Sequence, residues 1–335
     1  NFLRPVPLLE PYNEYPISAQ WGEYLLTAFE DKVIFHFDTV SAHLYLVEVR
    51  TAGKFEDGNV RLIFSTDETS SEYKLCLTGS ATAKGYAYQL ISGPDVFVQR
   101  GESEPVSLSE YMEIDPVMIH YSDGSFSYNA HIVHVSQKIG LYDKDEIVAF
   151  DWKGTDVRVE SMGYTRDPSS IQWRWYSEIK DNYDVIINDD GKGESADLVG
   201  LRIVDDCIVL SLIHCKYSGS EEAGARLKDL YEVCGQAQRC IRWKHLNLSY
   251  LYHHIKRREE QWRSRGHSRF LKGTIKDLAA MKERSRITPL KFQVVIVQPG
   301  LRVSKINEEG LKLLGSTALF IKKTTMADLV VIGSK

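Results

Sequence analysis

Three side chains with complementary chemistry stand at the ends of two consecutive predicted strands. Asp197 begins one of these strands, and His214 and Lys216 end the next. Because residues i and i+2 of a strand share a face, His214 and Lys216 should project together, with Cys215 pointing back into the protein. If the two strands pair as a hairpin, Asp197 lies opposite the end of the second strand. The spacing therefore predicts that a carboxylate, an imidazole and an ammonium group converge at one edge of a sheet.

This group of side chains suits the hydrolysis of a phosphodiester bond. A carboxylate such as Asp197 can hold Mg²⁺ or Mn²⁺, which polarises a phosphoryl oxygen and acidifies a bound water. An ammonium group beside the metal, here Lys216, can orient that water and offset the charge that builds on phosphorus. Further oxygen ligands could come from the backbone carbonyl of Cys215 and from nearby carboxylates. These carboxylates are Glu194, Asp190 and Asp189, of which the last two also form a good turn with Gly191.

Other catalytic fingerprints are absent from the sequence. We find no GxSxG elbow, Walker loop, dinucleotide-binding fingerprint or HExxH motif. The five cysteines, an odd number without CxxC spacing, argue against a zinc site built from cysteines alone. They favour free thiols in a reducing cytoplasm.

Helical and strand patterns should position these residues. Apolar residues between 227 and 241 recur at spacings of three and four, which predicts an amphipathic helix. A nearly unbroken apolar run from 207 to 213 predicts a strand buried on both faces. The order helix, three strands, helix, strand predicts an α/β domain with a mixed sheet. The expected elements are a helix from 171 capped by Ser169 or Ser170, strands at 183–188, 196–204 and 207–217, helix over 224–243 and on to 283, a strand at 292–297, helices at 308–314 and 318–323, and a strand at 329–332.

The segment from Ser169 to Gly300 resembles the PD-(D/E)xK nuclease superfamily, whose core has this element order. Asp197 falls where the family has its metal-binding Asp, and Lys216 matches the family's Lys. The stretch from 193 to 197 is similar to the sequence around this Asp in Mrr-type restriction endonucleases. The resemblance implies a restriction-endonuclease-like mixed sheet flanked by helices, with Mg²⁺ or Mn²⁺ as cofactor. It also implies nuclease action on DNA, with RNA less favoured, in bacterial restriction or antiviral (phage) defence.

One position departs from the family pattern. His214 stands where the family has Glu or Gln, and His is a poor ligand for Mg²⁺ but a better one for Mn²⁺. His214 would then orient water or phosphate, with Glu194 or Asp190 supplying the missing carboxylate. The following helix contains Gln236 and Gln238, similar to the helix glutamine that supports the site in RecB-like nucleases, and we favour Gln236.

A basic segment follows the predicted site. Residues 239–291 contain 15 Lys and Arg against four acids, a net charge of +11 in a chain whose net charge is -5. Such a local excess on an acidic body is typical of a groove that binds a polyanion. The candidate phosphate contacts are Arg239, Arg242, Lys244, Arg257, Arg258, Arg263 and Arg265.

The N-terminal half has a different pattern. Short runs rich in Val, Ile, Tyr and Phe predict strands at 32–37, 43–49, 60–64, 86–91 and 95–99, and a hairpin across 118–128. We therefore expect an α+β protein overall, with a β-rich accessory domain at 1–160 and a nuclease-like domain at 161–335. No signal peptide or apolar run long enough for a membrane span is visible, so we expect a cytoplasmic protein with no membrane partner. The first residue is Asn1 rather than Met, and the chain could be part of a longer protein with a helicase or ATPase domain or subunit as partner.

Two alternatives to an active nuclease stay open. The first is a catalytically inactive nuclease-fold module that binds nucleic acid or scaffolds a defence complex, which the histidine at 214 keeps possible. The second is an interaction scaffold without nucleic-acid contact. Cleavage assays separate the first from an enzyme, and a steep salt dependence of binding would count against the second.

Overall fold

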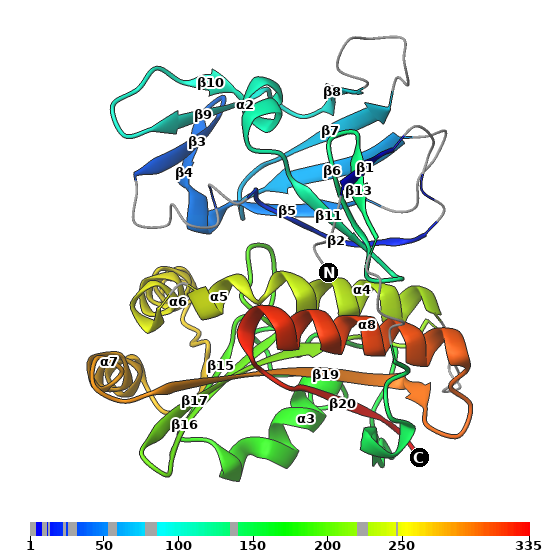
Figure 1. The fold of residues 1–335 in the computed structure, drawn as a ribbon. Coiled ribbons are helices and arrows are strands. Elements are labelled where there is room, and N and C mark those ends of the chain that lie inside the picture. The colour runs from blue at the N-terminus through cyan, green and yellow to red at the C-terminus, as the bar shows by residue number, and fades with distance from the viewer. Residues whose placement is uncertain are drawn as a thin grey trace. The chain divides into compact units, whose positions relative to one another are not determined.

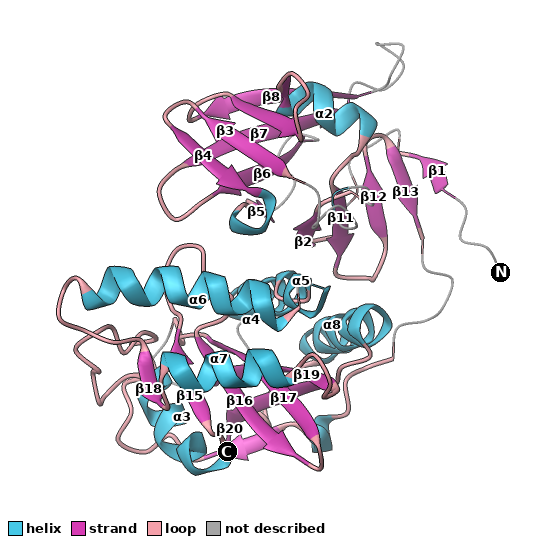
Figure 2. Cartoon of the chain, turned by 90° about the vertical axis from the view of Figure 1, so that its left-hand side faces the viewer, coloured by secondary structure: helices cyan, strands magenta, loops and turns pink. Residues whose placement is uncertain are grey.

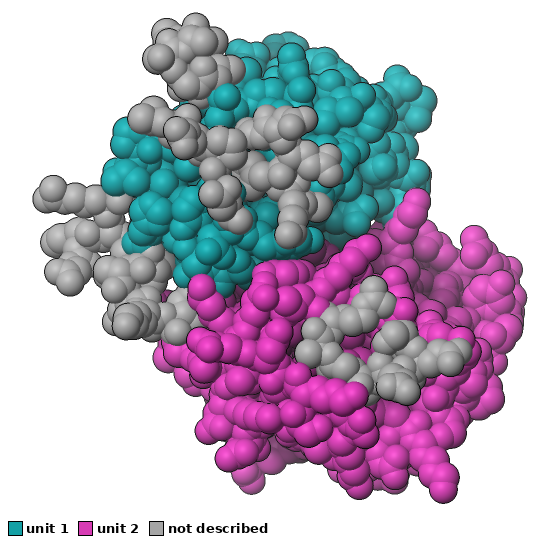
Figure 3. Space-filling view, turned by 90° about the vertical axis from the view of Figure 1, so that its right-hand side faces the viewer, with its two compact units in different colours: residues 1–139 teal, residues 140–335 magenta. Residues whose placement is uncertain are grey.

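The structure, a computed structural model, describes residues 5–8, 12, 14–22, 25, 32–52, 59–77, 86–134, 140–219, 227–245 and 247–335. The chain divides into two compact units, Asn1–Ile139 and Gly140–Lys335, which Figure 3 colours separately. It is an α+β protein with several sheets, as predicted. No helix among the described residues has the length and apolar content to cross a membrane.

Unit 1 consists mainly of antiparallel strands in three sheets with the orders β1-β13-β12-β11-β2, β10-β9-β3-β4 and β5-β6-β7-β8. Buried and partly buried residues alternate along β6, so one face of this strand packs on the core and the other is partly accessible to solvent. The hairpin across 118–128 is confirmed by the pairing of β11 with β12. The strand expected at 43–49 is interrupted by a 3-10 turn, and β7 was not predicted. The elements are β1 (Pro5–Pro7), β2 (Pro16–Gln20), β3 (Val33–Phe37), β4 (Val40–His43), η1 (Leu44–Leu46), β5 (Glu48–Thr51), β6 (Asn59–Ser65), β7 (Ser70–Leu77), β8 (Tyr86–Ser92), β9 (Val96–Arg100), β10 (Val106–Ser107), α2 (Leu108–Ile114), β11 (Met118–Tyr121), β12 (Phe126–Tyr128) and β13 (His131–Val133).

Unit 2 is built around one seven-stranded mixed sheet with the order β14-β20-β19-β17-β16-β15-β18. The pairs β18–β15, β15–β16 and β16–β17 are antiparallel. The pairs β17–β19, β19–β20 and β20–β14 are parallel. The elements are η3 (Lys144–Glu146), β14 (Val148–Phe150), α3 (Ile171–Ile179), η4 (Lys180–Asn182), β15 (Val185–Asn188), β16 (Leu198–Val204), β17 (Cys207–Cys215), α4 (Leu227–Arg239), α5 (Arg242–His245), α6 (Leu248–Arg263), β18 (Phe270–Lys272), α7 (Ile275–Arg284), β19 (Leu290–Arg302), α8 (Glu308–Thr325) and β20 (Leu329–Ser334).

Helices cover both faces of this sheet, as Figures 1 and 2 show. On one face α4 contacts β17, β19 and α8. On the other, Ile171 and Trp175 of α3 share a buried apolar cluster with Ile213 of β17. Strand β17 is therefore buried on both faces, which explains its nearly continuous apolar sequence.

The predicted order of helix, three strands, helix and strand is present as α3, β15, β16, β17, α4 and β19. Ser170 is the cap of α3, since its hydroxyl accepts the N–H of Trp173. Helix α8 is one continuous helix where two were expected. The helix expected through to 283 is instead divided into α5, α6 and α7, with β18 inserted at the edge of the sheet.

Residues 140–160 belong to unit 2, which differs from the boundary expected at residue 160. Strand β14 pairs in parallel with β20, and Trp152 lies in the same apolar cluster as α3. The expected boundary followed the charged, glycine-containing composition of 151–167. The apolar side chains within that stretch, Trp152 and Met162, instead anchor it to the core of unit 2.

Candidate metal centre

Asp197 lies at the meeting point of β16, β17 and α3. Its side chain is 1% exposed. Gln172 Nε2 donates to Asp197 Oδ1 at 2.9 Å, and the backbone N–H of Cys215 donates to Oδ2 at 2.8 Å. The start of β16 thus lies beside the end of β17, as expected from a hairpin, and the antiparallel register of the two strands enforces this position.

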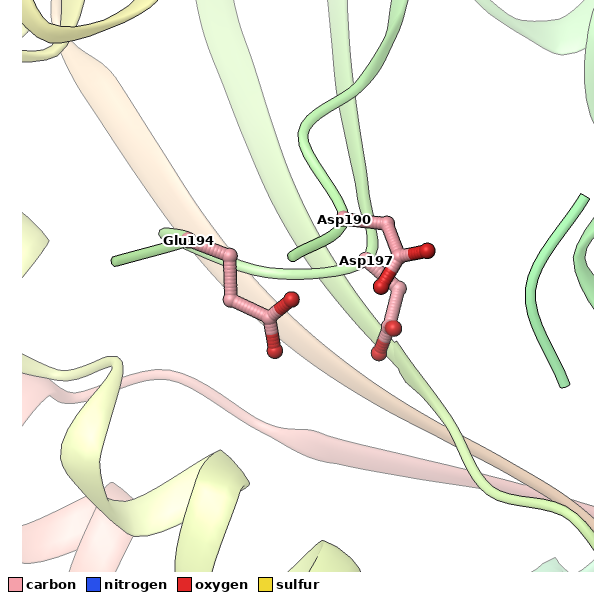
Figure 4. Close-up of side chains that lie close together, drawn as sticks. All are labelled: Asp190, Glu194 and Asp197. Carbon is pink, nitrogen blue, oxygen red and sulfur yellow. The ribbon is translucent and has the colours of Figure 1, made fainter. Parts of the chain in front are cut away.

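Two further carboxylates lie next to Asp197. One oxygen from each of Asp190, Glu194 and Asp197 falls within 4.8 Å of the others, and Figure 4 shows the three carboxylate groups close together. Burial raises the pKa of Asp197 well above its usual value, and the negative charges of Glu194, Asp190 and Glu160 raise it further. Carboxylate oxygens are the ligands that hard divalent cations prefer, and such a cation would relieve this repulsion.

The two acids of the β15–β16 loop are oriented by local hydrogen bonds. Glu194 Oε2 accepts the N–H of Gly191 at 2.8 Å, and Glu194 Oε1 accepts from Gln236 Nε2 at 3.5 Å. The hydroxyl of Ser161 donates to Asp190 Oδ2. These contacts come from three separate segments, so the cluster forms only in the folded unit.

Of the two candidate glutamines, Gln236 is the one near the acids. Gln238 lies on the opposite flank of α4, where its Nε2 donates to Thr317 Oγ1 of α8 at 3.2 Å. The preference for Gln236 therefore agrees with the geometry. Its contact with Glu194 is long for a hydrogen bond, which makes it a weak support.

The backbone of Cys215 is turned toward the cluster. Its N–H bonds to Asp197, whereas the N–H of the next residue, Lys216, bonds to the Val297 carbonyl on the other side of the strand at 2.9 Å. The N–H and C=O of one strand residue point to the same side, so the Cys215 carbonyl also points toward Asp197. This orientation is compatible with the carbonyl ligand expected from the sequence.

Lys216 is held between two glutamates. Its Nζ lies 3.3 Å from Glu160 Oε2 and 3.1 Å from Glu232 Oε2. Burial alone would lower the pKa of Lys216, but the two carboxylates outweigh it and raise the pKa, so the ammonium stays charged. Because Glu160 also contributes to the raised pKa of Asp197, it connects Lys216 electrostatically with the acidic cluster.

His214 does not take part in the cluster. It is 2% exposed, and neither ring nitrogen has a hydrogen-bond partner among the described residues. Burial lowers its pKa to about 3, and the positive charge of Arg239 on α4 adds to this effect. The expectation that His214 orients water or phosphate is therefore corrected: its side chain is a buried neutral imidazole beside α4.

The basic residues predicted to contact phosphate differ in their exposure to solvent. Arg263 and Arg265 are exposed, with Arg263 Nε 2.6 Å from Glu259 Oε1. Arg258 is 2% exposed and bonded to the acidic loop, so it cannot contact a phosphate backbone, and this expectation is wrong. The remaining candidates, which are partly buried, are Arg239, Arg242, Lys244 and Arg257.

Sequence reasoning missed two residues of the site. Gln172 is fully buried on α3 and binds Asp197, and Glu160 precedes this helix and binds Lys216. A signal for Gln172 was present, because it is a polar residue on the helix face that carries Ile171 and Trp175. Glu160 had no such signal, since it lies in an irregular charged stretch.

Comparison with known proteins adds no assignment. No family model matches the chain, and searches of curated proteins and of solved structures found no match either.

Proposed function

We propose that unit 2 is a PD-(D/E)xK-like, metal-dependent nuclease domain that hydrolyses phosphodiester bonds, with DNA favoured over RNA. The element order from α3 to β19 supports the proposal, as does the place of Asp197 at the start of β16 beside the end of β17. The observation that carries it is the buried carboxylate of Asp197. This group faces further acids, and no cation among the described residues pairs with it directly.

The donor set fits Mg²⁺ or Mn²⁺. Asp197, Glu194 and Asp190 would hold the ion through carboxylate oxygens, with the Cys215 carbonyl as a further ligand. When bound, such an ion polarises the phosphoryl oxygens and acidifies a water ligand. The number of carboxylates, with Glu160 nearby, allows one or two ions.

The protein's own groups would position the reactants. Gln172 and the Cys215 N–H fix the Asp197 carboxylate. Lys216, kept charged by Glu160 and Glu232, would offset the negative charge that develops on phosphorus. The exposed Arg263 and Arg265, at the end of α6 and just after it, would contact the nucleic-acid backbone and draw it to the site. A role in restriction or phage defence, with a helicase or ATPase as partner, is part of the same proposal.

An inactive nucleic-acid-binding module is the second candidate. It is favoured by the engagement of Lys216 with two carboxylates and by the absence of His214 from the cluster. Under this alternative, nucleic acid binds with strong salt dependence but is not cut in Mg²⁺, in Mn²⁺ or in EDTA.

A cleavage assay on single- and double-stranded DNA tests the proposal. Cleavage is expected with Mg²⁺ or Mn²⁺ and not with EDTA, and Asp197→Ala and Lys216→Ala should abolish it while nucleic-acid binding persists. The exposed residues Asp181 and Lys291 provide matched controls, and Asp181→Ala and Lys291→Ala should cleave like the wild type. Full activity in both site variants would refute the proposal.

A further inference from the structure

The loop that joins β15 to β16 carries two of the three clustered carboxylates on a backbone that needs external support. Asp190 and Glu194 flank a stretch in which Gly191 has φ 109° and Gly193 has φ 72°. Both values lie in the region that favours glycine. Glycines lose much conformational freedom on folding, so a loop with two of them does not hold its side chains in place unaided.

Arg258 of α6 binds this loop at four acceptors. Its Nε donates to Asp189 Oδ1 at 2.6 Å. Its Nη2 donates to the carbonyl of Asp189 at 2.7 Å and to that of Asp190 at 3.1 Å, and its Nη1 donates to the carbonyl of Lys192 at 2.5 Å. The guanidinium thus holds the backbone on both sides of Gly191.

A second arginine strengthens the same contact. Arg269 Nη1 donates to the carbonyls of Asn188 at 2.9 Å and of Asp190 at 3.2 Å. The carbonyl of Asp190 therefore accepts from both arginines. Their donors bind the loop backbone and the Asp189 carboxylate, whereas the carboxylates of Asp190 and Glu194 project toward Asp197 (Figure 4).

Arg258 is itself fixed in place. It is 2% exposed, and Leu251 and Ile255 of the same helix are buried. The Nε of Arg258 lies 2.6 Å from Asp189 Oδ1, and both side chains are buried.

We propose that Arg258 is a positioning residue of the metal centre, which fixes the β15–β16 loop so that Asp190 and Glu194 meet Asp197. The inference rests on the proposed metal site. It depends on the planar fork of the guanidinium, because five directed donors can serve one carboxylate and three carbonyls at once. A lysine would keep the positive charge beside Asp189 but could not bridge the carbonyls.

Binding of Mn²⁺ to the full chain, followed by the EPR signal of free Mn²⁺, tests this role. Arg258→Lys should weaken Mn²⁺ binding by about 10- to 100-fold, the range found when groups that orient metal ligands are removed. Arg286→Lys, at an exposed arginine of the same unit that forms a surface ion pair with Glu283, is the matched control and should bind like the wild type. Hydrogen exchange should accelerate in Arg258→Lys at residues 189–195 and not in β17.

The outcomes separate this role from the proposed function. Equal Mn²⁺ affinity in the wild type and in Arg258→Lys would overturn the positioning role and leave the nuclease proposal intact. Absence of Mn²⁺ binding in the wild type would overturn the metal site and the positioning role together. Should Arg258→Lys not fold, Arg269→Lys loses the bonds to the Asn188 and Asp190 carbonyls and should weaken Mn²⁺ binding to a smaller extent. Unchanged affinity in that variant would likewise overturn the proposal.

Discussion

Asp189 and Asp197 stand at the two ends of one loop, are both buried, and have surroundings of opposite charge. Asp189 bonds to Arg258, His254 and the backbone and hydroxyl of Ser195. Asp197 has two neutral donors and faces other acids. The pKa of the first is held well below its usual range, and that of the second is raised well above it.

The contrast separates a structural acid from a candidate functional one. A buried carboxylate is stable only when its charge is compensated. The chain compensates Asp189 with its own cations, whereas the acids around Asp197 add charge of the same sign. Perturbation of this kind in a group with clustered partners is typical of sites that bind or react. A cation bound from solution would compensate the charge of Asp197, as Arg258 compensates the charge of Asp189.

Asparagine substitutions at the two positions should differ strongly in their effect on stability. Asp189→Asn leaves the Arg258 guanidinium buried without its counter-charge, and we expect it to lower the free energy of unfolding by about 3–5 kcal/mol. Asp197→Asn removes repulsion and should cost nothing comparable in metal-free buffer. In the wild type, a Mn²⁺ concentration of about 100 times Kd should raise the free energy of unfolding by about 2.7 kcal/mol. Asp197→Asn should lose most of this stabilisation.

Urea unfolding with and without Mn²⁺ measures both halves of this prediction. A matched reference is Asp181→Ala, which alters an exposed acid of the same unit and should leave both values unchanged. Equal destabilisation by the two asparagine variants in metal-free buffer would contradict the distinction between the two acids.

The sequence was sufficient to predict the part of the site that lies on regular strands. Strand alternation and the polar ends of two apolar strands were enough to bring Asp197 beside the 214–216 strand end. The helical pattern left Gln236 and Gln238 on opposite flanks, and the preference for Gln236 came from the family resemblance. Period and burial determine such positions locally. The same reasoning failed for His214, because alternation gives the face of the strand but not what covers that face.

The contacts of Arg258 with the β15–β16 loop and of Glu160 with Lys216 join segments that are distant in the sequence. Arg258 was assigned to nucleic acid because it lies in a basic run, yet it binds a loop 69 positions earlier in the chain. Charge counts cannot distinguish a solvated arginine from a buried one, since that depends on which helix face meets the loop. Glu160 was missed for the same reason: its partner Lys216 is known only once β17 and the segment before α3 are packed together.

The two glutamates that bind Lys216 should differ in their effect on the metal site. Glu160 raises the pKa of Asp197 and thus lies within reach of the cluster, whereas Glu232 is a half-exposed partner on α4. We expect Glu160→Gln to weaken Mn²⁺ binding about tenfold, at the low end of the range for groups near a metal. Glu232→Gln should change it little, because such exposed ion pairs contribute at most about 1 kcal/mol.

Titration of Mn²⁺ binding in the two variants gives this comparison directly, each serving as the other's control. Both remove one carboxylate from Lys216, so a change common to both would reflect the lysine. Equal losses in the two variants would place Glu160 outside the metal site.

His214 contacts neither Asp189 nor the acids around Asp197, and its replacement should have the smallest effect of the substitutions considered. Its ring is buried and neutral with a pKa of about 3, whereas in the unfolded chain it would titrate near 6.5. As the pH falls, the unfolded chain therefore takes up a proton on this ring before the folded chain does, so stability is lost below about pH 6.5. His214→Phe removes this term and should unfold less readily than the wild type by about 1 kcal/mol at pH 6, with no such gain at pH 8. Urea midpoints at the two pH values test this, and cleavage should persist in the variant because the ring does not touch the acids. Loss of cleavage with folding intact would return His214 to the site and favour the role that the sequence alone suggested.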